Sequence, residues 1–70
     1  MAMTAVERER AAEEAVRQLR AELTGAGVVL PSLKVDATSL ASSEPRPLLD
    51  LGRCNLDTAL RLVAALKGAR

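Results

Sequence analysis

The first third of the chain has the hydrophobic and polar pattern of an amphipathic helix. Thr4 and Glu7 stand in the order of a capping box, which starts a helix by satisfying two free backbone N–H groups. Strong helix formers follow, and Gly25 and Gly27 favour the end of the helix. The apolar residues at helical spacing are Ala5, Ala12, Val16, Leu19 and Leu23. The pattern predicts a helix over residues 4–24.

The middle of the chain predicts two short strands. Residues 28–36 are rich in Val and Leu, and Pro31 breaks the run too early for a helix. Because Pro31 has no N–H to donate, this strand is expected at a sheet edge or with a bulge. Residues 37–45 are rich in Ser and Thr without periodicity and predict a loop. Residues 46–53 predict the second strand of an antiparallel hairpin with a long connection.

The last segment is again amphipathic. Asn55 is a suitable N-cap, and Asp57 stands in the first turn, where a negative charge is favourable. Lys67 lies near the C-terminal end, where cations are favoured. One face carries Leu56, Ala59, Leu60, Val63, Ala64 and Leu66. A helix is predicted over 55–67, so the fold class predicted for residues 1–70 is a single α+β domain of two layers, helix–β-hairpin–helix (αββα).

The amino-acid composition provides few large side chains for a hydrophobic core. Of 70 residues 49% are hydrophobic, but none is Phe, Tyr, Trp or His. Aromatic side chains bury about 150–250 Å² each, and that contribution is missing. Ordering the chain costs roughly 1.5 kcal/mol per residue, which Leu, Val and Ala must offset. We therefore expect a homodimer, or a subunit bound to a larger protein partner.

Two arrangements of such a dimer stay open. The hairpins of two copies can pair across a two-fold axis, which removes an exposed sheet edge. Alternatively, the two N-terminal helices can pack along their apolar stripes. The residues predicted for self-association are Val16, Leu19, Leu23, Val28 and Leu30.

Charge provides no strong signal for a nucleic acid or a membrane. Ten basic and nine acidic residues leave a net charge of +1. The arginines of the first helix alternate with glutamates, and no aromatic residue is present for base stacking, so a nucleic-acid-binding transcriptional regulator is only an alternative. No apolar run approaches the roughly 20 residues of a membrane span. The single cysteine suits a reducing compartment, and a cytoplasmic location is expected.

Cys54 is the nucleophile with the most interesting position. It follows Arg53 at the predicted start of the last helix, and both the cation and the helix dipole stabilise a thiolate. A thiol-based sensor or anion-binding module using Arg53 and Cys54 is therefore a second alternative. The chain has no His and no second Cys to support such chemistry, so we favour a half-buried structural residue. No catalytic, cofactor-binding or metal-binding residue is predicted, and the chain is not expected to be an enzyme.

Apolar residues outside the predicted core are the stronger functional signal. Leu40 stands in a polar loop, and exposed apolar patches mark interfaces. The residues predicted to contact a partner lie at the junction of the second strand and the last helix: Leu49, Leu51, Arg53 and Cys54. The sequence thus favours a small, non-catalytic interaction or regulatory accessory subunit.

Residues 27–33 (GVVLPSL) and 47–55 (PLLDLGRCN), followed by an Ala- and Leu-rich helix, form a recognisable pattern. The pattern, LPSL…PLxxLGRCN, resembles that of small uncharacterised proteins of high-GC actinobacteria. The resemblance covers about Leu19 to Ala69. That group has no established activity, so the resemblance carries over no catalytic residue. Some members are encoded near regulators, which implies a bacterial accessory or regulatory role.

Overall fold

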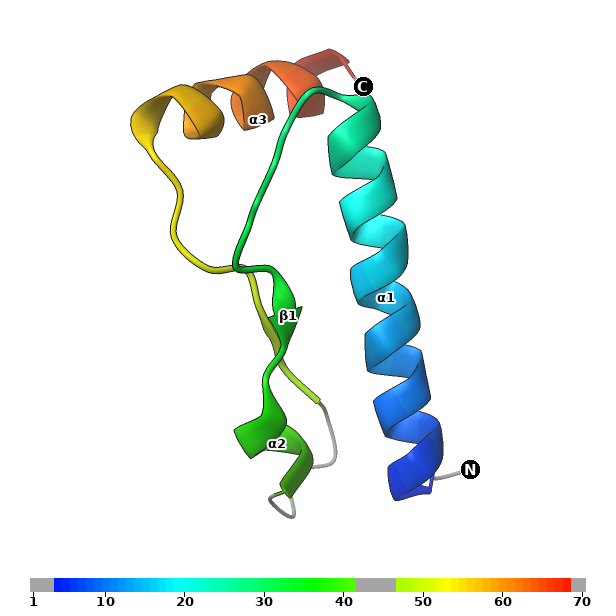
Figure 1. The fold of residues 1–70 in the computed structure, drawn as a ribbon. Coiled ribbons are helices and arrows are strands. Elements are labelled where there is room, and N and C mark those ends of the chain that lie inside the picture. Colours follow the sequence, from blue (N-terminus) through cyan, green and yellow to red (C-terminus); the bar gives the residue numbers. More distant parts are fainter. Residues whose placement is uncertain (1–3, 42–46, 69–70) are drawn as a thin grey trace.

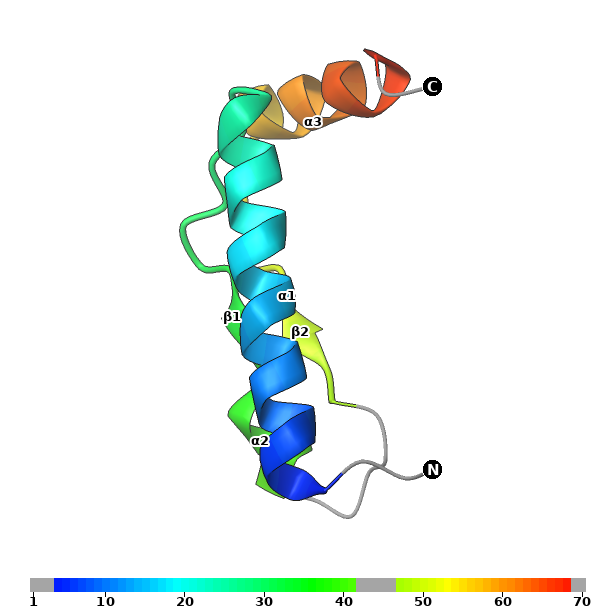
Figure 2. The same ribbon diagram turned by 90° about the vertical axis from the view of Figure 1, so that its right-hand side faces the viewer.

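The structure is a computed structural model that describes residues 4–41 and 47–68. Its elements are α1 (Ala5–Gly25), β1 (Lys34–Val35), α2 (Ala37–Ala41), β2 (Leu49–Asp50) and α3 (Leu56–Gly68). The long α1 has β1 and α2 along its side, and α3 lies crosswise at the C-terminal end of α1 (Figure 1). Figure 2 shows the same arrangement from the side. The protein is thus small and α+β, as predicted, and it is elongated, measuring 37 × 23 × 15 Å.

Both ends of α1 have well-formed caps. The Thr4 hydroxyl accepts the Glu7 backbone N–H at 3.1 Å, and the Glu7 carboxylate accepts the Thr4 backbone N–H at 3.1 Å. At the other end Gly27 takes a φ of +77°, which glycine adopts without strain. Its N–H donates to the Thr24 carbonyl, and the Val28 N–H donates to that of Leu23 at 2.8 Å. This is a Schellman motif, and it confirms that a glycine ends the helix.

Acidification is expected to weaken α1. The backbone N–H and side chain of Thr4 lower the pKa of Glu7, and hydrogen bonds from Arg17 and Gln18 lower that of Glu14. A lowered folded-state pKa adds stability above the ordinary value of 4.5, and this stability is lost as the pH falls through the folded-state pKa. Urea unfolding can be followed by circular dichroism at 222 nm. The urea concentration at the midpoint should therefore decrease once the pH is below about 4.5.

The double variant Glu7→Gln/Glu14→Gln tests this expectation. It should start with a lower urea midpoint at pH 7 and lose less of it on acidification than the unaltered chain. Parallel pH profiles for the two proteins would show that these carboxylates do not couple the stability of α1 to pH.

The core lies between α1 and the segment that leads into β1. Four buried hydrophobic residues form it. Ala12 and Val16 come from α1, and Val28 and Leu33 come from the connecting segment. The Arg20 guanidinium donates to the Leu33 carbonyl oxygen at 2.7 Å and so joins the middle of α1 to the start of β1. One narrow stripe of α1 is therefore enough to hold the hairpin.

The hairpin is shorter than the sequence predicts. β1 pairs with β2 antiparallel, with Lys34 opposite Asp50 and Val35 opposite Leu49, but the pairing covers only these residues instead of 28–36 and 46–53. A turn at Pro31 is the first reason, because the Leu33 N–H donates to the Leu30 carbonyl at 3.2 Å across it. On the other strand the Asp50 carboxylate accepts the Gly52 N–H at 2.8 Å, which turns the chain away from the ladder.

A short helix, α2, occupies the start of the segment predicted as a loop over 37–45. The Asp36 carboxylate accepts the Thr38 N–H at 3.1 Å, and the Asp36 carbonyl accepts the Ser39 hydroxyl at 2.7 Å. Ser39 is buried, and its hydroxyl also accepts the Leu48 N–H at 2.9 Å. The polar residues thus cap a helical turn and attach it to the hairpin. Residues 42–45 of the predicted loop lie outside the described residues.

Candidate functional site

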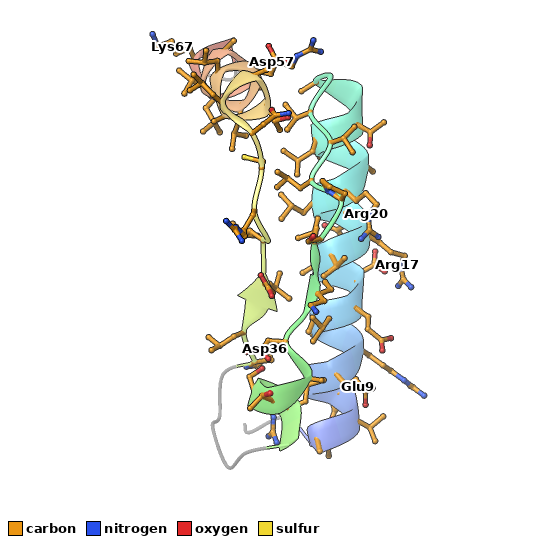
Figure 3. All side chains as sticks on the ribbon, turned by 60° about the vertical axis from the view of Figure 1, so that its left-hand side comes forward. Glu9, Arg17, Arg20, Asp36, Asp57 and Lys67 are labelled. Carbon is orange, nitrogen blue, oxygen red and sulfur yellow. The ribbon has the colours of Figure 1, made fainter. Side chains whose placement is uncertain are left out.

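α3 is well started by its own residues. The Asn55 side chain accepts the Thr58 N–H at 2.8 Å, which confirms Asn55 as the N-cap. Asp57 lies in the first turn and accepts a hydrogen bond from the Arg61 guanidinium at 3.0 Å. In Figure 3, Asp57 and Lys67 lie on the side of α3 that faces away from the hairpin. The start of α3 therefore has good local support.

Four large apolar side chains of α3 are exposed in the described part of the chain. Four large residues at spacings of four, three and three lie on one face, and we call them the α3 stripe. They are Leu56, 74% exposed, Leu60, 58%, Val63, 47%, and Leu66, 60%. No described residue of α3 is buried. Whereas α1 packs on β1 and α2, α3 has no comparable contact with any other element among the described residues.

The apolar arc of α3 is wider than the part that the chain shields. Ala59, Leu62 and Ala65 are half-buried, while the α3 stripe beside them stays exposed. Burying a Leu or Val side chain fully stabilises by about 1.5–3 kcal/mol. Covering the exposed arc would therefore be strongly favourable.

Two further exposed residues adjoin the start of α3. Val29 is 65% exposed and lines a shallow depression together with Cys54 and Thr58. Leu51, in the segment between β2 and α3, is 51% exposed. Around Gly52 this segment runs close to Ser32, so the turn before β1 and the segment before α3 lie side by side. No residue of the α3 stripe lines this depression, so Val29 and Leu51 are separate exposed apolar residues near the start of α3.

Three of the four residues predicted for partner contact are accessible. Leu51, Arg53 and Cys54 are exposed, whereas Leu49 is half-buried in β2. The expectation that Cys54 is half-buried is wrong, because the thiol lies on the exposed segment before α3. Their role in binding stays a prediction. The sequence predicted an amphipathic face here, but the spacing of its apolar residues does not show whether the face is covered.

The residues predicted for self-association lie along the contact between α1 and the segment that follows it. Val16 and Val28 are buried within the chain, and Leu19, Leu23 and Leu30 are half-buried. Leu23, Val28 and Leu30 line one pocket between α1 and the connecting segment, which gives them a role inside one chain. Self-association through them stays a prediction.

The described residues bring together few groups for other chemistry. No three His, Cys, Asp or Glu side chains within 4–41 and 47–68 are placed to hold a metal ion. On α1, Arg17 pairs with Glu14 on the exposed side of the helix. None of the helices in the described part is both long and apolar enough to cross a membrane.

Comparison with known proteins gives no match. No protein family model matches the chain, and neither a curated protein nor a solved structure is significantly similar to it. The resemblance to actinobacterial proteins stays a prediction, and a functional proposal has to rest on the surface of the chain itself.

Proposed function

We propose that this protein is a non-catalytic interaction or accessory subunit that acts by protein–protein contact through the α3 stripe. One observation carries the proposal: a well-capped helix presents Leu56, Leu60, Val63 and Leu66 to solvent on one face. A helix usually covers such a face with the rest of its own domain. An exposed apolar patch of this kind is typical of an interface.

The spacing of the α3 stripe suits a known mode of recognition. Amphipathic helices bind apolar grooves or other helices through anchors at positions i, i+4 and i+7, and Leu56, Leu60 and Val63 have this spacing. Because the chain has no aromatic residue, such an interface depends on aliphatic side chains. The polar side, with Asp57 and Arg61 ion-paired, remains free to face solvent.

A pair of matched variants tests this function. Leu60→Gln removes an anchor of the α3 stripe, and Arg61→Gln changes the neighbouring exposed residue to the same side chain. Partners recovered from cell extract by the tagged chain should bind Leu60→Gln about tenfold or more weakly, because one apolar anchor is lost. Arg61→Gln should bind as the unaltered chain does, with affinities measured by titration of the purified partner.

Equal affinities for the two variants would contradict the proposal. Circular dichroism of both variants provides the folding control. Leu60 is 58% exposed, so its replacement should leave the helical signal intact.

A further inference from the structure

We infer that the cavity between α1 and the connecting segment binds a small aliphatic carboxylate. The cavity has a volume of about 130 Å³, and its lining residues lie between Arg20 and Leu33. An engineered apolar cavity of about 150 Å³ in another protein holds a molecule of the size of benzene, so this space suits an aliphatic tail of about four or five carbons. Because the described lining residues lie outside α3, the inference does not depend on the proposed function.

The reversal of the chain after α1 forms this cavity. Gly27 turns the chain back along the helix, and the hydrogen bond from the Leu33 N–H to the Leu30 carbonyl closes a turn in the connecting segment. Val28 and Leu33 are buried and Leu30 is half-buried, so this wall of the cavity is apolar and held in place. Leu23 contributes an apolar wall from α1. The cavity is therefore largely preformed and suited to an aliphatic group.

Arg20 places a positive charge at the same cavity. Its guanidinium donates to the Leu33 carbonyl oxygen at 2.7 Å, which orients the group beside the connecting segment (Figure 3). A guanidinium has further N–H donors in a planar fork that matches a carboxylate. Within the described part of the chain Arg20 forms no ion pair, whereas Arg17 pairs with Glu14. Arg20 is exposed, so its remaining donors are open to a ligand from solvent.

An aliphatic carboxylate matches both features of the cavity at once. Its tail replaces water at the apolar walls, and its charge meets an oriented guanidinium. Thr24 also lines the cavity, and its hydroxyl is a further donor for the carboxylate oxygens. An inorganic phosphate would supply charge without a tail, and an amine would be repelled by Arg20. A ligand with about eight non-hydrogen atoms at such a site is expected to bind with a dissociation constant on the order of 1 mM.

Titration of the full chain with isocaproate and with its neutral amide, isocaproamide, tests the inference. The methyl NMR signals of Val28, Leu30 and Leu33 should move with isocaproate and saturate with a dissociation constant on the order of 1 mM. The amide has the same tail without the charge. It should bind about five- to tenfold more weakly, because the charged contact with the guanidinium is lost. The methyl signals of Leu48 and Leu60, which are exposed elsewhere, should not move.

A pair of matched variants on α1 locates the charge. Arg20→Gln should weaken the binding of isocaproate by about five- to tenfold and leave that of isocaproamide unchanged. Arg17→Gln removes another exposed arginine of α1 and should bind isocaproate as the unaltered chain does. Circular dichroism of both variants is the folding control. The comparison of acid and amide on the unaltered chain needs no variant, so it decides the inference even if Arg20→Gln loosens the connecting segment.

Several results would overturn the inference. If the signals of Val28, Leu30 and Leu33 do not move and saturate at concentrations up to about tenfold above the expected dissociation constant, the cavity is not a ligand site. Equal affinities for isocaproate and isocaproamide would show that the cavity takes apolar molecules without recognising a carboxylate. Equal movement of the Leu48 and Leu60 signals would show general adsorption to apolar surface. Each of these outcomes leaves the proposed role of the α3 stripe unaffected.

Discussion

Replacing Leu33 by alanine is expected to lower the free energy of unfolding by about 2–4 kcal/mol. Leu33 is only 3% exposed and lies where the connecting segment packs against α1. Removing most of its side chain leaves a cavity beside Val28 and Leu23, with which Leu33 lines one pocket. Its carbonyl oxygen accepts the Arg20 guanidinium at 2.7 Å, so the surrounding backbone is held and cannot easily collapse into the space.

The effect is large because so few residues form this core. Domains are stable by about 5–15 kcal/mol, and a small chain without aromatic residues is expected near the lower end. Urea unfolding followed by circular dichroism should show a much lower midpoint for Leu33→Ala than for the unaltered chain. Leu48→Ala is the matched control, since Leu48 is 55% exposed and the same change there should alter stability by about 0.5 kcal/mol or less. Similar losses of unfolding free energy in the two variants would contradict the placement of Leu33 in the core.

Replacing Gly52 by alanine is expected to cost about 2–4 kcal/mol, for two separate reasons. Gly52 has a φ of +75°, which strains a residue with a side chain. The added Cβ would also lie 2.4 Å from the Ser32 Cβ, and 3.2 and 3.3 Å from the Ser32 Cα and carbonyl carbon. Two of these atoms belong to the backbone, so rotation of a side chain does not relieve the clash.

Two other glycines separate these contributions. Gly27 has a φ of +77° but open space around it, so Gly27→Ala should cost only about 1 kcal/mol, from the backbone conformation. Gly25 ends α1 at an ordinary φ with no neighbour within 4 Å, and Gly25→Ala should stabilise by about 0.4–1 kcal/mol. The urea midpoint should therefore be highest for Gly25→Ala and should decrease through the unaltered chain and Gly27→Ala to Gly52→Ala. Equal losses at Gly27 and Gly52 would show that the approach of Ser32 does not matter.

The two long helices were predictable because short-range contacts define them. The Thr4–Glu7 capping box and the Asn55 N-cap join atoms three residues apart, and both form as predicted. The predicted ranges of 4–24 and 55–67 differ from the observed helices by one residue at each end. Local hydrogen bonds and helix propensity carry this information, and both are visible in the sequence.

The hairpin and α2 were harder to predict, because distant atoms decide them. Ser39 belongs to a segment with no periodicity, yet it is buried and its hydroxyl accepts the N–H of Leu48, nine residues away. Asp36 both caps α2 and donates its own N–H to the Leu48 carbonyl at 2.9 Å. Polar residues that satisfy partners of this kind have the composition of a loop, so sequence alone favours the wrong structure.

The candidate surface depended entirely on the tertiary structure. By sequence, the stripe of α1 around Val16 and that of α3 around Leu60 have the same kind of periodicity, and both predict an amphipathic face. Val28 and Leu33 fold back to cover the first stripe, whereas no described segment covers the second to the same extent. The sequence by itself therefore determined where α1 and α3 begin and end, since their caps are local. Only the tertiary structure decided which apolar face is left for a partner, because covering a face requires residues far away along the chain.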